Sequence, residues 1–188
     1  STWDHTGADM RPGVGKFFLR LANGFCKLYL TVIRGTPVVV QLMIIYYIIF
    51  AASNNGVGIA MLAFGINSGA YVAEIIRGGI MSIDAGQFEA GRSLGLNYTQ
   101  TMRDIIIPQA FKNVLPALAN EFIVLLKETS VAGYVSVLDL TKGGDIIRGR
   151  TYSAFMPLIA VALIYLVLVI FFTWLVGRLE RRLRSSDH

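Results

Sequence analysis

Charged residues are scarce in this chain of 188 residues. Aspartate, glutamate, lysine and arginine together make up 15% of it, whereas hydrophobic residues make up 54%. A soluble domain of ordinary composition is about 25% charged and about 45–50% apolar. The composition therefore argues against a disordered chain and a routine soluble enzyme. It also argues against a nucleic-acid module, although the net charge is +5. A membrane protein of one domain is the class that it favours.

Cysteine and histidine are almost absent as well. With Cys26 as the single cysteine, no internal disulfide can form, and a thiolate metal site is disfavoured. The histidines, His5 and His188, lie at opposite ends of the chain, so a nucleophilic triad lacks its base. The sequence also has no Gly-x4-Gly-Lys-Ser/Thr phosphate loop and no His-Glu-x2-His zinc motif. We therefore assign no catalytic residue, no metal and no cofactor to this chain.

Long stretches without charge indicate transmembrane helices. Residues 35–73 contain no charged side chain, and a single helix of that length would extend about 58 Å, roughly twice the thickness of the bilayer core. The turn-like sequence Ser53-Asn54-Asn55-Gly56 divides the stretch. We therefore predict two spans, at about 37–52 and 57–76.

The second half of the chain predicts two further spans. Residues 153–177 have the strongest transmembrane signal, with Trp174 as an interfacial anchor. Residues 110–130 are apolar but include Glu121, and a charged side chain at mid-helix costs about 2.5–3.5 kcal/mol or more in lipid. We predict that this segment spans the membrane with its polar face towards protein or water. The expected fold class is therefore an all-α, polytopic bundle of four transmembrane helices.

The basic residues predict the orientation. Thirteen of the 17 precede the first span, lie between the second and third, or follow the last, and basic residues accumulate on the cytoplasmic side. We therefore expect both termini and the loop at 77–112 in the cytoplasm, with anionic membrane lipid as a partner. Residues 16–182 form the predicted domain, between polar tails at 1–15 and 183–188. Within it, Phe17–Ile33 predicts an amphipathic helix on the inner leaflet.

The loop at 82–108 carries strong local signals. Asp84 and Asn97 each fit a helix N-cap, because each is followed three residues later by a glutamine. Gly95 is placed to end the first of these helices with a left-handed cap. The residues alone leave three interpretations open: a surface for a partner protein, a base for the membrane bundle, and a hairpin that lies on lipid.

The same loop resembles the "EAA" loop of bacterial ATP-binding-cassette importer permeases. The family pattern is Glu-Ala-Ala, three residues, Gly, nine residues, Ile-x-Leu-Pro. Here it reads Glu89-Ala90-Gly91, Gly95, Ile105-x-Ile107-Pro108, with Gly91 and Ile107 as departures. The resemblance covers about residues 27–182 and is greatest for the polar amino-acid subfamily. Its further matches are Arg34-Gly35-Thr36-Pro37 with Gln41, residues 70–80, residues 86–90 and residues 126–131.

This resemblance implies a type I importer permease fold and a function. The chain would be the permease subunit of an ATP-driven importer of polar amino acids of the histidine, glutamine or arginine type, in the bacterial inner membrane. Its implied partners are separate ATPase subunits that carry ATP and Mg, a second permease subunit in a homo- or heterodimer, and an extracytoplasmic amino-acid-binding protein. The implied ATPase-coupling residues are Glu89, Ala90, Gly91, Gly95, Ile105, Ile107 and Pro108. Such permeases usually have one more span, before Arg34, which we do not find here.

Polar residues of the third predicted span are candidates for a substrate pathway. They are Asn120, Glu121, Lys127, Glu128, Thr129 and Ser130. A lysine and a carboxylate could receive the two charged groups of a zwitterion. The alternative is that Lys127 and Glu128 form a structural ion pair at the outer interface. Glu74 and Arg77, three residues apart, similarly favour a local pair over a role in the pathway.

Two other functions are alternatives to an importer permease. The missing first span is compatible with a truncated permease, or with a non-transporting membrane scaffold derived from one. An ion-coupled secondary carrier is disfavoured, because such a carrier needs no capped loop for an ATPase. Residues 131–150 are expected to lie outside the membrane, either as a plain loop or with a short gate helix at about 135–140.

Overall fold

A computed structural model describes residues 14–184, and all of the regular structure in them is helical. The predicted polar tails therefore lie almost entirely outside the described residues. The α-helices are α1 (Val14–Gly35), α2 (Val38–Ile44), α3 (Gly56–Met81), α4 (Ala85–Ser93), α5 (Tyr98–Thr101), α6 (Ile107–Glu128), α7 (Leu140–Thr151) and α8 (Phe155–Arg184). Two π-helical turns (Ile45–Ile49 and Met102–Ile106) and a 3-10 turn (Thr129–Val135) connect some of them. The expectation of an all-α chain is confirmed.

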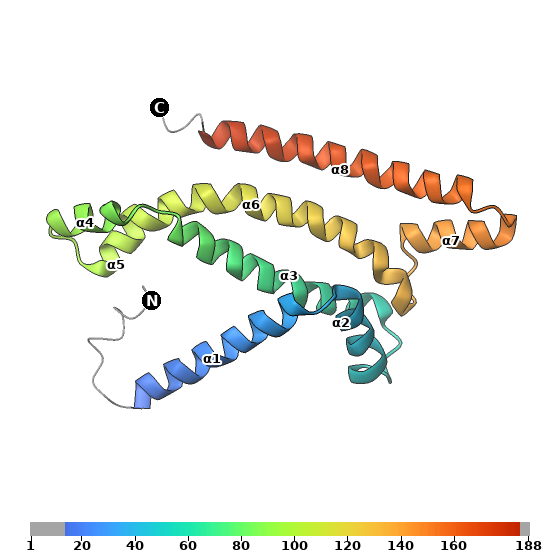
Figure 1. Ribbon diagram of the computed structural model, residues 1–188, viewed down its shortest axis with the longest axis horizontal. Helices are drawn as coiled ribbons and strands as arrows, with labels where there is room; N and C mark the ends of the chain where they lie inside the picture. Colours follow the sequence, from blue (N-terminus) through green and yellow to red (C-terminus); the bar gives the residue numbers. More distant parts are fainter. Residues whose placement is uncertain (1–13, 185–188) are drawn as a thin grey trace.

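The long helices α3, α6 and α8 run side by side, with α4 and α5 beyond one end and α7 at the other (Figure 1). Helix α6 packs on both α3 and α8, and α7 folds back on α8. Helices α3 and α6 are in close contact at Gly79, where an added Cβ would overlap Cγ2 of Val114 and lie 3.5 Å from the carbonyl oxygen of Ala110. A small residue is required here because the side chain of Val114 fills the space beside the α3 backbone, and small residues are common where membrane helices pack closely.

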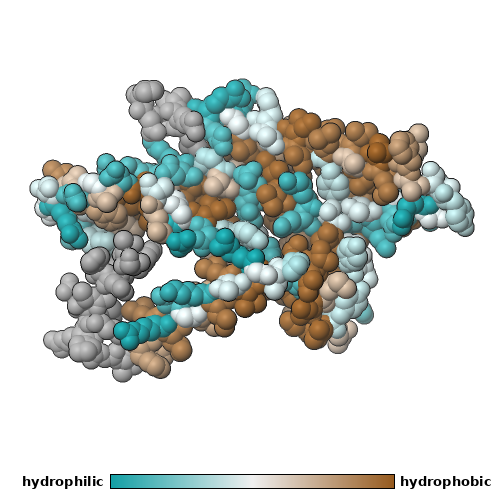
Figure 2. All heavy atoms as spheres, viewed as in Figure 1, coloured by the Kyte–Doolittle hydropathy of each residue, from teal (hydrophilic) through white to brown (hydrophobic). Residues whose placement is uncertain are grey.

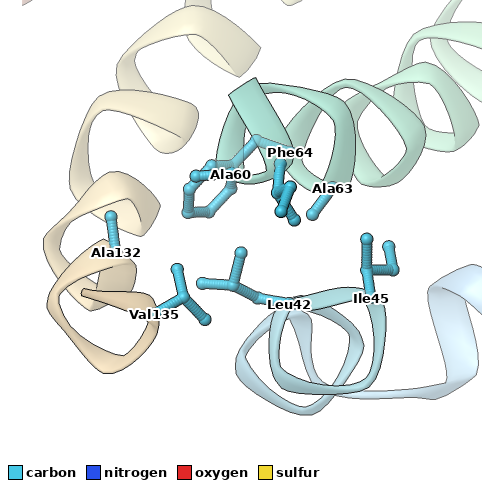
Figure 3. Packing of buried hydrophobic residues seen from close by; sticks show 8 residues of the cluster. Leu42, Ile45, Ala60, Ala63, Phe64, Ala132 and Val135 are labelled. Carbon is cyan, nitrogen blue, oxygen red and sulfur yellow. The ribbon is translucent and has the colours of Figure 1, made fainter. Parts of the chain in front are cut away.

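A cluster of buried hydrophobic residues (Figure 3) is formed by segments at the end of the molecule opposite to α4 and α5 (Figure 1). It joins α2 and its π-helical turn, the first half of α3 and the 3-10 turn after α6. Leu42 and Val135 are fully buried, and Ala60 and Ala63 give them room on α3. The cluster therefore connects segments that are far apart in the sequence.

Two helices, α3 and α8, are each long and apolar enough to cross a membrane. They correspond to the predicted spans at 57–76 and 153–177, and hydrophobic side chains gather over α8 (Figure 2). In addition, Phe17–Gly35 and Val38–Ile49 meet this criterion together, as a pair bent by 109°. Helix α6 is not among the helices that meet it. The number of spans and the predicted boundaries of the domain therefore stay predictions.

The bend between α1 and α2 is fixed by one amide side chain. Nε2 of Gln41 donates to the carbonyl oxygen of Ile33 (2.7 Å) and to both oxygens of Thr36 (3.0 and 2.6 Å). Oε1 of Gln41 accepts from Nδ2 of Asn67 on α3 (3.0 Å). The side chain of Gln41 is buried, so it satisfies the carbonyl groups that the bend leaves without helical partners. The segment around Pro37 is thereby attached to α3.

The region after α6 differs from the gate helix considered at 135–140. Residues 129–135 form a 3-10 turn, and the next helix, α7, begins only at Leu140. The reason is local. Asp139 is the N-cap, and its carboxylate accepts a hydrogen bond from the backbone N–H of Lys142 (2.6 Å).

Candidate functional site: the coupling loop and the polar face of α6

The coupling loop, residues 82–108, begins with a capped helix. Oδ1 of Asp84 accepts from the backbone N–H of Gly86 (2.6 Å) at the start of α4. The helix ends just before Gly95, whose φ of +77° lies in the left-handed region that favours glycine. Both predicted ends are therefore confirmed. The glutamine expected to complete the first cap, Gln87, instead accepts a hydrogen bond from Gln109 on α6 (3.2 Å).

The second helix of the coupling loop has the complete capping box that the sequence predicts. Oδ1 of Asn97 accepts from the backbone N–H of Gln100, and Oε1 of Gln100 accepts from the backbone N–H of Asn97 (both 2.9 Å). After α5 the chain passes through the π-helical turn 102–106 straight into α6. Pro108, at the start of α6, has no N–H for a helical bond, and a π-helical turn just before it accommodates this loss. The loop is thus continuous with a long helix.

Helices α4 and α5 are locked together at Gly91. This glycine is buried, and a Cβ on it would lie 2.6 Å from Cγ2 and 2.7 Å from Oγ1 of Thr101. The rings of Phe88 and Tyr98 stack beside this contact, with centroids 6.2 Å apart. The backbone N–H of Leu96 closes the corner on the carbonyl oxygen of Gly91 (3.0 Å). These contacts fix the angle between the two helices.

The predicted coupling residues differ in their exposure. Glu89 and Ala90 are exposed on α4, and Ile107 and Pro108 are exposed at the start of α6. Gly91 is buried, Gly95 forms the open corner, and Ile105 is half-buried. Ile106 and Thr101 are not in the predicted coupling set, but they are 0% and 2% exposed and hold the loop together from inside. Ile106 occupies the variable position of the family pattern, so the pattern could not point to it.

The candidate pathway residues of α6 are only partly brought together. Glu121 is half-buried and accepts from Oγ of Ser68 on α3 (3.3 Å). Asn120 and Lys127 are exposed, and Oγ1 of Thr129 donates to the carbonyl oxygen of Leu126 (2.7 Å). Glu128 and Ser130 are half-buried at the end of the helix. The ion pairs of the described residues include none between Lys127 and Glu128, because neighbouring residues on a helix do not face each other.

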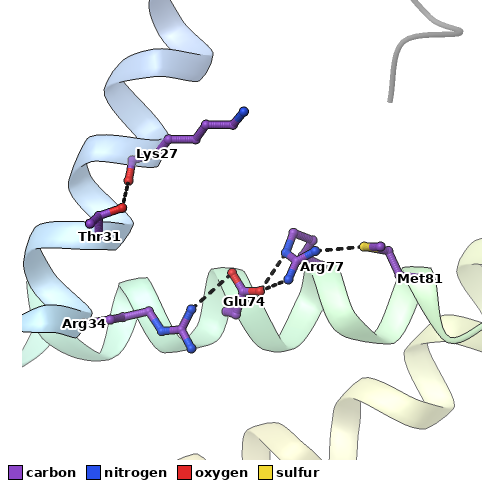
Figure 4. A network of polar contacts seen from close by, with 6 residues as sticks. All are labelled: Lys27, Thr31, Arg34, Glu74, Arg77 and Met81. Atoms are coloured by element: carbon purple, nitrogen blue, oxygen red, sulfur yellow. Dashed lines mark hydrogen bonds and ion pairs between the residues drawn. The ribbon is translucent and has the colours of Figure 1, made fainter. Parts of the chain in front are cut away.

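Glu74 is the centre of a charge network (Figure 4). It pairs with Arg77 on its own helix, as the spacing predicts, and with Arg34 of α1 at 3.5 Å. The guanidinium group of Arg34 also lies over the ring of Tyr71, 5.7 Å from its centroid. Nη1 of Arg77 donates in turn to Sδ of Met81 (2.9 Å). The contacts of Arg34, which the sequence interpretation did not predict, hold the end of α1 against α3.

Apolar helices long enough to cross a membrane, joined to a capped helical loop at one end, indicate a polytopic membrane protein. Comparison with known proteins gives the family. The model of the family "Binding-protein-dependent transport system inner membrane component" matches residues 14–185. The arginine transport system permease protein ArtQ of Bacillus subtilis is 42% identical over 162 residues, which cover 85% of this chain and 74% of that protein. The glutamine transport system permease protein GlnP of Escherichia coli K12 is 39% identical over 168 residues, 87% of this chain and 77% of that protein.

Solved structures agree with this family. The structure described as an amino acid ABC transporter with histidines superposes with a TM-score of 0.79 at 49% identity, covering 83% of this chain and 74% of that one. An inward-facing MetNI methionine ABC transporter shares the fold, with a TM-score of 0.69 at 20% identity over 92% of this chain and 80% of that one. The chain therefore belongs to the family of binding-protein-dependent transport system inner membrane components. It is a permease subunit of an ATP-driven importer, and its role is translocation and not catalysis.

Proposed function

We propose that this permease subunit imports polar amino acids and is driven by separate ATPase subunits that dock on the coupling loop. The cargo follows from the relatives, which are arginine and glutamine permeases, and from the structural neighbour with histidines. The docking role rests on one observation. The coupling loop is a capped, internally locked pair of helices that exposes Glu89 at one end of the molecule.

The rigidity of the loop is what suits it to transmit force. A flexible segment would absorb the motion of a partner, whereas α4 cannot turn relative to α5 without separating Gly91 from Thr101. We propose that α4 enters a cleft on the ATPase and that the carboxylate of Glu89 accepts hydrogen bonds from a basic or amide group there. Closure of the ATPase pair would then move the loops of two permease subunits and switch them between outward- and inward-facing states.

The remaining partners are proposed from the family to which the chain belongs. ATP and Mg belong to the ATPase, and this chain binds no cofactor of its own. A second permease subunit, identical or different, completes the pore, and an extracytoplasmic binding protein delivers the amino acid. The coupling loop and both termini lie in the cytoplasm, in keeping with the distribution of basic residues. Anionic lipid neutralises part of that basic excess.

The polar residues of α6 are the proposed substrate pathway. Helix α6 follows the coupling loop without a break in the helical backbone, so motion of the loop reaches it directly. The Ser68–Glu121 contact places a carboxylate between α3 and α6, where the α-amino group of an amino acid would be attracted. Lys127 provides a positive charge near the end of the same helix for the α-carboxylate.

Co-expression with a candidate ATPase and a binding protein tests the proposal. Loss of a hydrogen bond to a charged group costs about 1.5–3 kcal/mol, so Glu89→Ala should weaken ATPase retention about tenfold or more. ATP-dependent uptake of radiolabelled arginine, glutamine or histidine should fall with it. Thr99→Ala, a change at an exposed position of α5, is the matched control. Docking without uptake by the unmodified chain would reject transport, and unchanged docking in Glu89→Ala would reject the assigned contact.

A further inference from the structure

We infer that the hydrogen bond between Gln87 and Gln109 transmits movement of α4 to α6, which makes these glutamines positioning residues for coupling. The inference rests on the proposed docking of an ATPase on the coupling loop. Neither residue belongs to the predicted coupling set. Gln87 lies in the first turn of α4 and Gln109 in the first turn of α6, 22 residues apart in the sequence.

The geometry holds the amide of Gln109 from two sides. Its Nε2 donates to Oε1 of Gln87 (3.2 Å) and to the carbonyl oxygen of Ile105 (2.9 Å). An amide nitrogen has two hydrogens, so both bonds can form at once. Both glutamines are half-buried, which limits competition from water. Ile105 lies in the π-helical turn before Pro108. The side chain of Gln109 therefore connects α4 to this turn and to the start of α6.

This contact adds a direct link between the two helices, beside the packing of α4 on the π-helical turn 102–106. Along the backbone, a displacement of α4 must pass the corner at Gly95, helix α5 and the π-helical turn before it reaches α6. The packing of Gly91 on Thr101 and of Phe88 on Tyr98 fastens α4 to α5. The Gln87–Gln109 bond instead joins α4 to the helix that carries the proposed pathway residues.

A second long-range amide contact at the same end of the bundle provides a control. Nδ2 of Asn113, one turn further along α6, donates to Oγ of Ser82 just after α3 (3.0 Å). Like the Gln87–Gln109 bond, it has a side-chain amide donor near the start of α6, but it is exposed and its acceptor is a hydroxyl oxygen. However, it joins α6 to the end of α3 and does not involve α4. A variant at Asn113 therefore separates a general loosening of the bundle from a loss of transmission from α4.

The test uses the complete transporter in proteoliposomes and measures amino acid transported per ATP hydrolysed. Gln87→Leu and Gln109→Leu should retain the ATPase in a pull-down but lower this ratio about fivefold. This factor is the change in an equilibrium constant that corresponds to the loss of one neutral hydrogen bond. The double variant should lower it no further. Gln87→Glu combined with Gln109→Lys should restore it, because an ion pair replaces the lost bond. Asn113→Leu should leave the ratio unchanged.

The outcomes separate this inference from the proposed function. If the unmodified chain retains no ATPase, both are overturned. If it retains the ATPase and transports, but Gln109→Leu has the unmodified ratio, only the role of the glutamines is overturned. An equal loss in Asn113→Leu also overturns it, because the effect would then be loosening of the bundle. Failure of the charge pair to restore the ratio argues against transmission through this contact.

Discussion

Thr101 occupies the space that a side chain at position 91 would need: a Cβ on Gly91 would lie 2.6 Å from Cγ2 of Thr101. The family pattern that this loop resembles has alanine at position 91. The glycine is therefore matched to a threonine ten residues later, and the two positions form one packing unit. The departure from the pattern is compensated within the loop.

Gly91→Ala should accordingly disturb the coupling loop, although it restores the family pattern. Overpacking of a closed contact costs about 1–3 kcal/mol, and we expect weaker ATPase retention and faster hydrogen exchange in α4. Adding Thr101→Ala removes both of the nearest atoms and should recover most of the loss. Gly143→Ala in α7, where nothing lies within 4 Å of the new Cβ, is the control. A Gly91→Ala variant as well protected as the original chain would contradict the packing argument.

At Gly95, the backbone conformation and not the available space should decide which substitutions are tolerated. Its φ is +77° and nothing lies within 4 Å of an added Cβ. Gly95→Ala should therefore lose about 1–2 kcal/mol of local stability, the cost of a left-handed backbone for an L-residue. Gly95→Asn should lose less, because asparagine adopts this conformation more readily. Hydrogen exchange of the backbone amides in α4 measures the order, and equal effects of the two substitutions would refute it.

From the packing of α3 on α6 we predict opposite effects of alanine substitution at two adjacent glycines. Gly79→Ala would force the new methyl group into Val114, whereas Gly78→Ala meets nothing within 4 Å. We expect Gly79→Ala to lower the thermal unfolding temperature of the purified protein in detergent, at a cost of about 1–3 kcal/mol. Gly78→Ala should be neutral or slightly stabilising. Similar unfolding temperatures for the two variants would show that the helices separate easily at this point.

Gln41 and Asn67 should differ in importance although they share a hydrogen bond. Gln41→Leu removes the donor to the Ile33 and Thr36 carbonyl groups and leaves Asn67 without its partner. Of the groups left without a partner, the Asn67 amide is buried, and a buried polar group left unsatisfied costs about 1–3 kcal/mol. Asn67→Leu frees only Oε1 of Gln41 and removes a buried Oδ1 that has no partner in the described part of the chain. Thermal unfolding should therefore show a larger loss for Gln41→Leu, and the reverse order would overturn this account of the bend.

The features that could be predicted from the sequence are those set by near neighbours. The caps at Asp84 and Asn97 and the corner at Gly95 depend on residues within a few positions, and all three were predicted correctly. The Glu74–Arg77 pair is local in the same way. By contrast, Gln41 meets Asn67 across 26 positions and Gln87 meets Gln109 across 22. Such pairs depend on how the helices cross, which no periodicity of the sequence specifies.

The buried cluster around Leu42 and Val135 also has a consequence for the order of folding. Contacts between residues near in sequence form quickly, whereas contacts across long stretches of chain form slowly because more loop entropy must be lost first. The coupling loop is closed by contacts of low sequence separation, and the buried cluster needs residues from both sides of α3 and α6. We therefore expect the surface proposed for the ATPase to form before the other end of the bundle.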